Sequence, residues 1–428
     1  MKMSTHATPQ TLAQKLIARA CGRAAVTSGE IVTCRVDLAM MHDSGGPRRV
    51  KPMLEQLGAS VWDPEKVVVV TDHYVPAEDE ESRRIVQIAR DWTRAEGVRR
   101  FHDEEGICHI VVPQKGYLKP GMFAVGGDSH SPTGGAFGAY MFGIGSTEML
   151  GVLVTGEIWL SVPHTIRIAW DNYLPPGVSA KDMMLFLCAH LGMDGGQYQA
   201  VEYSGRAVAA LSMQERMTLS NMTAELGGQA GLIAPDEVTM QWLAAVGVRD
   251  ASAEGWRSDP GASLLANHVF DAAALPPQVA APDSPSRAAA VGEYGGVGID
   301  VAYVGACTGA KLDDLRMAAS VLKGRRVANG VRLLVAPASM HDQAAARDEG
   351  TLATLVSAGA ELLPTACGAC AGYGGHLLQD GTVAISTTAR NFKGRMGSAS
   401  ARIYLGSPYT VAASAVTGRI TDPRELLQ

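Results

Sequence analysis

The sequence predicts an α/β protein of three domains with mostly parallel sheets. The unbroken run Val67–Val70 is typical of a strand buried on both faces of a parallel sheet. Apolar strand runs alternate with helical patterns through the last third of the chain. The length of 428 residues exceeds what one hydrophobic core supports. We expect α/β domains over residues 1–162, 163–284 and 285–428, the third carrying a group of cysteines.

Composition limits the kinds of partner. The chain has 37 basic and 43 acidic residues and a formal net charge of -6, so it has no electrostatic footprint for nucleic acid or for a membrane surface. No apolar run reaches the roughly 18 residues that a membrane helix needs, and the amino terminus lacks a signal-peptide pattern. Seven scattered cysteines argue against a disulfide framework. We therefore expect a cytoplasmic protein that binds small molecules or other proteins.

The first domain is expected to begin with a helix over residues 9–21 and a strand over Ile31–Val36. A polar turn then carries His42 and Asp43, two candidate substrate-binding residues. The turn alone fits equally well an aspartate that bonds backbone amides beside a partly exposed histidine. Residues 78–96 predict an amphipathic scaffold helix with an acidic first turn.

Histidines accompany three apolar runs of this domain. One Asp-His pair directly follows the run 66–70, where a carboxylate can fix the imidazole tautomer and raise its pKa. A second histidine is expected inside a short strand over residues 106–112. A single strand-end histidine is usually structural, but three together indicate a proton-transfer site. The candidates are Asp72, His73, His109, Asp128, Ser129 and His130.

The second domain is expected to open with a strand over residues 162–170. A helical pattern over residues 214–226 places Asn221 and Glu225 four apart on one face. Such a pair is more often two surface residues than part of a site. Residues 256–295 are rich in Pro, Ala and Ser and predict an extended linker.

The last third predicts a parallel sheet with helices on its faces. Strands are expected over 299–304, 331–335 and 382–385, and helices over 312–322 and about 341–357. Arg390 and Arg395 follow the final strand. A guanidinium pairs well with a carboxylate, although both arginines could also be solvated surface residues.

Three cysteines lie in Gly-rich turns that follow apolar runs: Cys307, Cys367 and Cys370. An iron-sulfur cluster usually has four thiolate ligands, so three leave one iron open to act as a Lewis acid. The cysteines alone also fit a redox C-x-x-C pair, a zinc site with a further ligand, or three buried thiols.

Taken together, these segments resemble the aconitase superfamily, most closely the large subunits of the 3-isopropylmalate dehydratase and homoaconitase type. The resemblance runs along nearly the whole chain and keeps the family's order. The segments that carry it are His42-Asp43, Thr71-Asp72-His73, Gly106-Ile107-Cys108-His109, Gly127-Asp128-Ser129-His130, Asn221-Met222-Thr223-Ala224-Glu225, Ala306-Cys307-Thr308-Gly309, Cys367 with Cys370, and Arg390 to Gly397.

The resemblance implies three domains packed around a [4Fe-4S] cluster on the three cysteines, with one open iron. It also implies a hydro-lyase that dehydrates and rehydrates a hydroxy di- or tricarboxylic acid. Catalytic pairs would be His73 with Asp72, His130 with Asp128, and His109 with Glu225. The substrate-binding candidates are His42, Asp43, Ser129, Asn221, Arg390 and Arg395.

The resemblance also implies a partner. In single-chain relatives a serine on a mobile fourth domain is the base, whereas this sequence ends at Gln428. We therefore expect a separate small subunit with the swivelling domain, in a heterodimer or heterotetramer, and an inactive chain without it.

Two positions depart from the family pattern. Gly309 and Ala389 stand where the family commonly has asparagine. A substrate other than isopropylmalate is therefore plausible, such as dimethylmalate or a homocitrate-like or methylcitrate-like acid. The alternatives of another class are an iron-sulfur regulator that binds RNA, which the net charge disfavours, and a non-catalytic paralogue that holds zinc.

Overall fold

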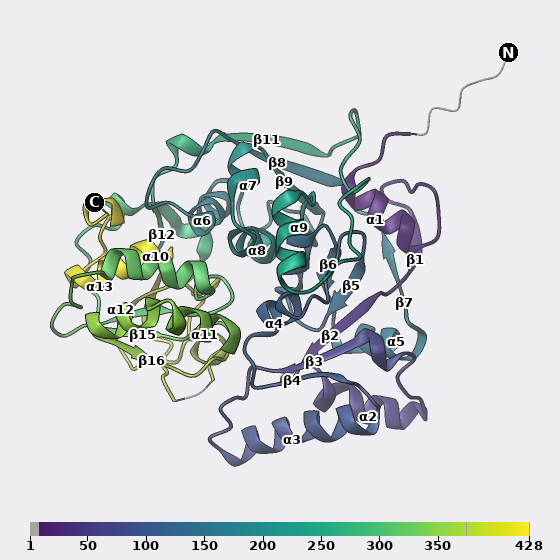
Figure 1. Ribbon diagram of the computed structural model, residues 1–428, viewed down its shortest axis with the longest axis horizontal. Helices are drawn as coiled ribbons and strands as arrows, with labels where there is room; N and C mark the ends of the chain where they lie inside the picture. Colours follow the sequence, from purple (N-terminus) through teal and green to yellow (C-terminus); the bar gives the residue numbers. More distant parts are fainter. Residues whose placement is uncertain (1–7, 374, 428) are drawn as a thin grey trace.

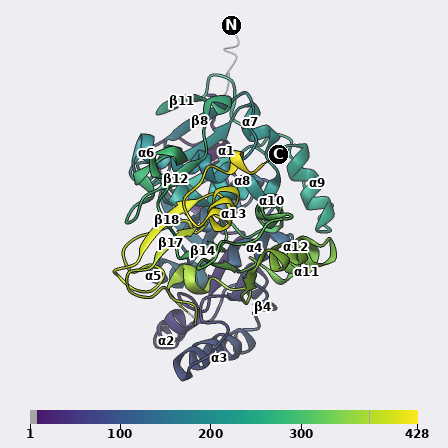
Figure 2. The ribbon, with the colours of Figure 1, turned by 90° about the vertical axis from the view of Figure 1, so that its left-hand side faces the viewer.

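The computed structural model describes residues 8–373 and 375–427 (Figure 1). Residues 1–7, which hold part of the segment expected to lack a signal peptide, lie outside the described residues, as do 374 and 428. Helices α2 and α3 lie at one end of the molecule and strands β8 and β11 at the other (Figure 2). No helix within the described residues is long and apolar enough to cross a membrane.

The first sheet has five parallel strands in the order β4-β3-β2-β5-β6. Alternate side chains of β3 belong to two different cores: Val67 and Val69 pack with α1, α2 and α3, whereas Val68 and Val70 pack with α4. The run is therefore apolar throughout because both faces of the sheet are covered. The strands are β2 (Leu38–His42), β3 (Val67–Thr71), β4 (Arg100–Asp103), β5 (Phe123–Gly126) and β6 (Tyr140–Gly143).

The helices of this region confirm two predictions and correct a third. Residues 9–21 and 78–96 contain α1 and α3, but the expected strand over 106–112 is wrong, because this segment enters helix α4. Its residues from Cys108 to Pro113 are all buried. The segment therefore lacks the alternation of apolar and polar faces from which a helix is predicted. The helices are α1 (Leu12–Ala20), α2 (Pro47–Leu57), α3 (Glu80–Ala95), α4 (Cys108–Gln114) and α5 (Ser146–Thr155).

The second sheet has four parallel strands in the order β10-β9-β8-β11. The predicted linker is wrong, because residues 256–295 contain β11 at the sheet edge and both β12 and β13 of the third sheet. Only alternate residues of β11 are partly buried, so its apolar pattern is weak. The elements are β8 (Thr165–Asp171), α6 (Ala180–Leu191), β9 (Ala200–Ser204), α7 (Arg206–Ala210), α8 (Met213–Asn221), β10 (Ala230–Ile233), α9 (Glu237–Ala245) and β11 (Ala266–Asp271).

The third sheet has seven strands in the order β13-β12-β18-β17-β14-β15-β16, and the last five of these are parallel. Its expected strands and helices are present, except that the helix predicted over 341–357 is divided in two at Gly350. The elements are β12 (Gln278–Ala280), β13 (Ala288–Ala290), β14 (Val301–Val304), α10 (Leu312–Leu322), β15 (Arg332–Val335), α11 (Met340–Asp348), α12 (Thr351–Ala358), β16 (Ala360–Leu362), β17 (Val383–Ser386), β18 (Arg402–Gly406) and α13 (Pro408–Thr417).

The mostly parallel α/β prediction is confirmed. Antiparallel pairing is confined, within the described residues, to β12 with its two neighbours and to the ribbon of β1 (Ile31–Arg35) with β7 (Glu157–Ser161), apart from two isolated bridges. The domain boundaries at residues 162 and 284 stay predictions.

Strand order reverses direction at one point in each of the three larger sheets, and in the second sheet this switch lies between β8 and β11. In the first sheet this switch lies between β2 and β5, and in the third between β14 and β17. In open α/β sheets ligands bind beyond the carboxyl ends of the strands at such a point. At the switch of the first sheet, His42 ends β2 and Gly127 follows β5. At the switch of the third sheet, Cys307 lies after β14 and Arg390 lies after β17. The topology therefore indicates where a site should form.

Candidate active site

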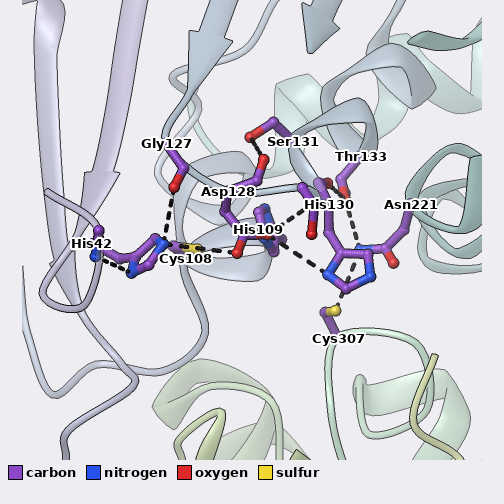
Figure 3. A network of polar contacts seen from close by, with 12 residues as sticks. His42, Cys108, His109, Gly127, Asp128, His130, Ser131, Thr133, Asn221 and Cys307 are labelled. Carbon is purple, nitrogen blue, oxygen red and sulfur yellow. Dashed lines mark hydrogen bonds and ion pairs between the residues drawn. The ribbon is translucent and has the colours of Figure 1, made fainter. Parts of the chain in front are cut away.

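The loops at the switch points of the first and third sheets line one cavity of about 310 Å³. It collects imidazoles from the first sheet and thiols and guanidinium groups from the third. The lining includes His42, His73, His109, Asp128, Ser129, His130, Cys307, Cys367, Cys370, Tyr373, Ala389, Arg390 and Arg395. Two polar walls from distant parts of the chain therefore face the same space (Figure 3).

Asp72 organises two of the imidazoles. Its Oδ1 accepts a hydrogen bond from His73 Nδ1 over 2.6 Å, and its Oδ2 accepts one from Cys108 N over 2.7 Å at the start of α4. The carboxylate thus orients His73 and also fixes the helix end that carries His109. Burial opposes the charged form of His73, but the charge of Asp72 prevails and raises the pKa of His73 to about 10.

His42 and Asp43 support the loop of His73. The rings of His42 and His73 stack with centroids 4.1 Å apart. His42 Nε2 lies 3.2 Å from Gly127 O, and Gly45 N donates to Nδ1, so backbone groups occupy both ring nitrogens. Burial lowers the pKa of His42, and the neighbouring charge of His73 acts in the same direction.

Asp43 lies behind the cavity and is completely buried. Its carboxylate accepts backbone N–H groups of Asp72, His73 and Tyr74, the last over 2.7 Å. This is the amide-bonding role that the sequence left open for the polar turn. Its contacts are with the protein backbone, so substrate contact by Asp43 has no geometric support.

The other two histidines have partners different from those expected. His109 Nε2 lies 2.7 Å from Asp128 Oδ1, and His130 Nε2 lies 3.0 Å from Glu225 Oε1. The predicted pairing of His109 with Glu225 is wrong, because His109 enters from α4 on the side of Asp128. The expected pair of His130 with Asp128 is joined through the backbone, because Asp128 Oδ1 accepts the N–H of His130. The ring nitrogen Nδ1 of His130 lies 3.6 Å from the same oxygen.

The pairs shift the pKa values of their own members and favour the charged forms. Burial opposes ionisation of Asp128, yet the neighbouring His109 and His130 hold its pKa well below the ordinary value. Burial also disfavours the charged form of His130, but Glu225 raises its pKa. Within the site the carboxylates are therefore anions and His130 is a good proton carrier.

The three cysteines meet at the same cavity. Cys307 follows β14, and Cys367 and Cys370 lie in the turn after β16. A hydrogen bond from Cys367, opposed by burial and helped by the charge of Arg395, lowers the pKa of Cys370 to about 5. Burial raises the pKa of Cys307 to about 12. One thiolate is thus ready to bind a metal centre, whereas Cys307 must lose a proton on binding.

Asn221 and Glu225 are buried parts of the site wall, not surface residues. Asn221 Nδ2 donates to Cys307 Sγ over 3.2 Å and to Thr133 Oγ1 over 2.8 Å (Figure 3). Helix α8 ends at Asn221, and a 3-10 turn continues the chain to Glu225. An N–H donor to a cysteine sulfur is a common means of tuning a bound iron-sulfur centre.

The two arginines differ in their present contacts. Arg390 donates to Glu225 Oε1 over 2.6 Å and to Ser129 Oγ over 3.0 Å. Arg395 lines the cavity, and its buried Nε has no hydrogen-bond partner among the described residues. Arg395 is therefore the guanidinium with free capacity for an anion.

Some site residues could not be found from the sequence. Tyr373 lines the cavity, and its hydroxyl accepts a hydrogen bond from Tyr74 over 3.2 Å. Lys181 lies behind the cysteine turns with 1% of its surface exposed. A lysine within an apolar helical pattern was the only available signal, and lysines are normally exposed.

Comparison with known proteins agrees with this arrangement. The chain matches the aconitase family (aconitate hydratase) over residues 14–418. It is 43% identical over 424 residues to 3-isopropylmalate dehydratase large subunit 1 of Methanopyrus kandleri, covering 98% of this chain and 100% of that protein. It is also 43% identical over 392 residues to the probable methanogen homoaconitase large subunit of Methanosarcina mazei, covering 91% of this chain and 99% of that protein.

A solved structure has a similar fold. Thermococcus kodakaraensis aconitase X, in its holo form, aligns over 90% of each chain with a TM-score of 0.53 and 12% sequence identity. At this identity the likeness concerns the fold alone. The family match and the two close relatives each span nearly the whole chain. The chain belongs to the aconitase family.

Proposed function

We propose that this chain is the cluster-bearing large subunit of a hydro-lyase of the 3-isopropylmalate dehydratase type. It would reversibly remove water from a hydroxy di- or tricarboxylic acid. The observation that carries the proposal is the single cavity in which three thiols, three Asp-His or Glu-His pairs and two arginines converge. Relatives of nearly equal length bear the names 3-isopropylmalate dehydratase and homoaconitase large subunit.

The residues fit a [4Fe-4S] cluster on Cys307, Cys367 and Cys370. Members of the aconitase family generally bind such a cluster. Buried atoms without partners among the described residues include Asn221 Oδ1, Glu225 Oε2 and Arg395 Nε, as a site awaiting a polar ligand would have. When bound, a cluster with three thiolate ligands would supply an open iron that could serve as a Lewis acid for the substrate hydroxyl.

The side chains of this chain would bind the acid and carry protons. Arg395, and Arg390 after release from Glu225, would hold substrate carboxylates. His73 keeps its proton at neutral pH because of Asp72, so it would donate a proton to the departing hydroxyl. The pairs of His109 with Asp128 and His130 with Glu225 would hold and relay the released proton.

A small subunit would complete the site. Among the residues that line the cavity, we assign none as the base that takes the proton from carbon. The partner would supply that base on a swivelling domain, as in the heterodimer or heterotetramer expected from the resemblance. The name large subunit in the relatives supports this proposal.

A related acid is the second candidate substrate. Ala389 lines the cavity with a single methyl group where the family commonly has asparagine. This enlarges the space beside the cysteines and removes one amide. Homocitrate-like, dimethylmalate and methylcitrate-like acids therefore stay candidates beside isopropylmalate.

The decisive test is anaerobic reconstitution of the chain with iron, sulfide and the proposed small subunit. We expect a brown, oxygen-sensitive complex that forms an unsaturated acid, followed by its ultraviolet absorbance, from one of these hydroxy-acids. The chain alone should be inactive. Zinc without inorganic sulfide in the wild-type protein would refute the cofactor assignment, and a cluster-loaded complex inactive on every acid would refute the reaction.

A further inference from the structure

Lys181 occupies a place that is unfavourable for a cation. It is the second residue of α6, where the partial positive charge of the helix end repels an ammonium group. It is also buried, with 1% of its surface exposed. Burial of a charge without a counter-ion is costly, so the ammonium group needs a nearby anion.

The protein gives Lys181 hydrogen bonds but no ion pair. Its Nζ donates to Thr388 O over 2.6 Å, to Thr387 O over 3.1 Å and to Thr308 Oγ1 over 3.4 Å. Among the described residues no carboxylate oxygen lies within 4.0 Å of it. These contacts connect the loop after β14, which carries Cys307, with the loop after β17, which carries Arg390.

Lys311 provides a contrast in the same layer. Its buried Nζ donates to Cys307 O over 3.0 Å and pairs with Asp314 Oδ2 over 2.6 Å. The charge of Lys311 is therefore neutralised inside the protein, whereas that of Lys181 is not.

Lys181 reaches the cysteine site through Thr308, the residue after Cys307, and the negative charges that act on it belong to the active site. Burial lowers the pKa of Lys181 to about 8, and the negative charges of Glu225, of Cys370 and of Cys307 once it is deprotonated act in the opposite direction. Glu225 already accepts hydrogen bonds from His130 and Arg390. The thiolate site is thus the counter-charge that remains.

We propose that Lys181 is the buried counter-charge of the three-cysteine site, a positioning residue whose ammonium group stabilises the anionic cluster and ties its two loops together. The inference rests on the proposed function, which places a cluster on these cysteines. Net charge and hydrogen bonding around a cluster set its reduction potential, so a fixed cation should favour the reduced, more negative form.

The test compares three substitutions in the full chain reconstituted with iron and sulfide. Lys181→Met removes charge and hydrogen bonds, Lys181→Gln keeps a donor without charge, and Lys181→Arg keeps the charge. We expect the midpoint potential, from a redox titration followed by electron paramagnetic resonance, to fall in the Met and Gln variants. A tenfold weaker preference for the reduced cluster corresponds to about 59 mV for one electron. Lys181→Arg should stay near wild type.

A matched control changes the neutral pair. The double variant Lys311→Gln with Asp314→Asn alters a lysine that contacts the cysteine turn but leaves the net charge unchanged, so its potential should match wild type. Equal potentials in wild type, Lys181→Gln and Lys181→Met would overturn the inference while leaving the proposed function intact. A wild-type protein that takes up no iron and sulfide would overturn both.

A second measurement addresses folding. Removing an uncompensated buried charge should leave the thermal midpoint of cluster-free Lys181→Gln close to that of wild type, while a chelator should strip its cluster about tenfold faster. A lysine with a purely structural role would instead lower the midpoint of both forms and leave the rate of cluster loss unchanged. That result would contradict a counter-charge role.

Discussion

At the residue scale, Asp72 sets the protonation of His73. Folding raises the pKa of His73 from 6.5 to about 10 and lowers that of Asp72 from 3.8 to about 2, so the pair stabilises the fold fully between pH 3.8 and 6.5. That contribution is lost as pH rises through 10. The same pair keeps His73, the proposed proton donor, protonated across the neutral pH range.

We predict that Asp72→Asn shifts the alkaline limb of kcat/KM of the reconstituted enzyme to lower pH by about 1 to 3 units, the usual effect of losing an adjacent charge. The pH profile of the two-subunit complex measures this shift. Asp79→Asn, at an exposed helix N-cap, serves as the control and should leave the limb in place. An unmoved limb in Asp72→Asn would exclude His73 as the acid.

A second residue-scale prediction concerns Ala306, which has φ of 69° beside Cys307 and is buried. A β-branched side chain tolerates this left-handed conformation poorly, so Ala306→Val should destabilise the cluster-free protein by about 1 to 3 kcal/mol. Ala306→Gly should not, because glycine adopts this conformation freely. Thermal unfolding compares the two, and equal midpoints would show that the turn relaxes.

At the element scale, the loops after β14 and β17 are clamped together. Thr387 Oγ1 accepts from Gly305 N over 2.9 Å and lies 2.8 Å from Gly305 O. A Cβ atom at Gly309 would overlap the Thr387 side chain. Glycine at this departure from the family pattern therefore makes room for the clamp.

We predict that Gly309→Asn lowers stability by about 1 to 3 kcal/mol through overpacking, and reduces the cluster content after reconstitution. The nearest atoms are Cβ and Oγ1 of Thr387, so Gly309→Asn with Thr387→Gly, which removes both, should restore part of the loss relative to Thr387→Gly alone. Thermal unfolding and iron and sulfide analysis measure both. Full stability of Gly309→Asn alone would mean that the two loops separate easily.

The sequence predicts elements with a clear period better than those without one. The Val67–Val70 run and the helix over 78–96 are confirmed because their burial patterns are regular. Helix α4 is buried on every side and the edge strand β11 on only one, so neither pattern is diagnostic.

For the candidate site, the sequence predicts which residues take part better than it predicts which partners they contact. Its cysteines, histidines and arginines are chemically conspicuous in the sequence and line one cavity. Their roles stay predictions, as does the cytoplasmic location. The partners of His109 and His130 depend on how α4 enters the site, and the burial of Lys181 depends on how α6 packs against loops of the third sheet. Such tertiary facts leave no trace in a linear pattern.

At the scale of the whole molecule, the site joins loops of the first and third sheets. A ligand that contacts only the folded arrangement stabilises it. Removal of the proposed cluster with a chelator under anaerobic conditions should therefore lower the thermal midpoint. It should also increase amide hydrogen exchange in the loops around Cys307, Cys370 and Arg395, whereas the ribbon of β1 and β7, which contributes no residue to the cavity lining, should change little. Uniform exchange in both states would argue against a cluster at these cysteines.

The meeting of two strand-order switches also dictates when the protein can mature. Synthesis runs from the amino to the carboxyl terminus, so His42 is made well before Cys370 and Arg395. The three thiols can meet only after the segment that carries Cys370 has been made and the third sheet has formed. The proposed cluster could therefore be loaded only after the third sheet has formed.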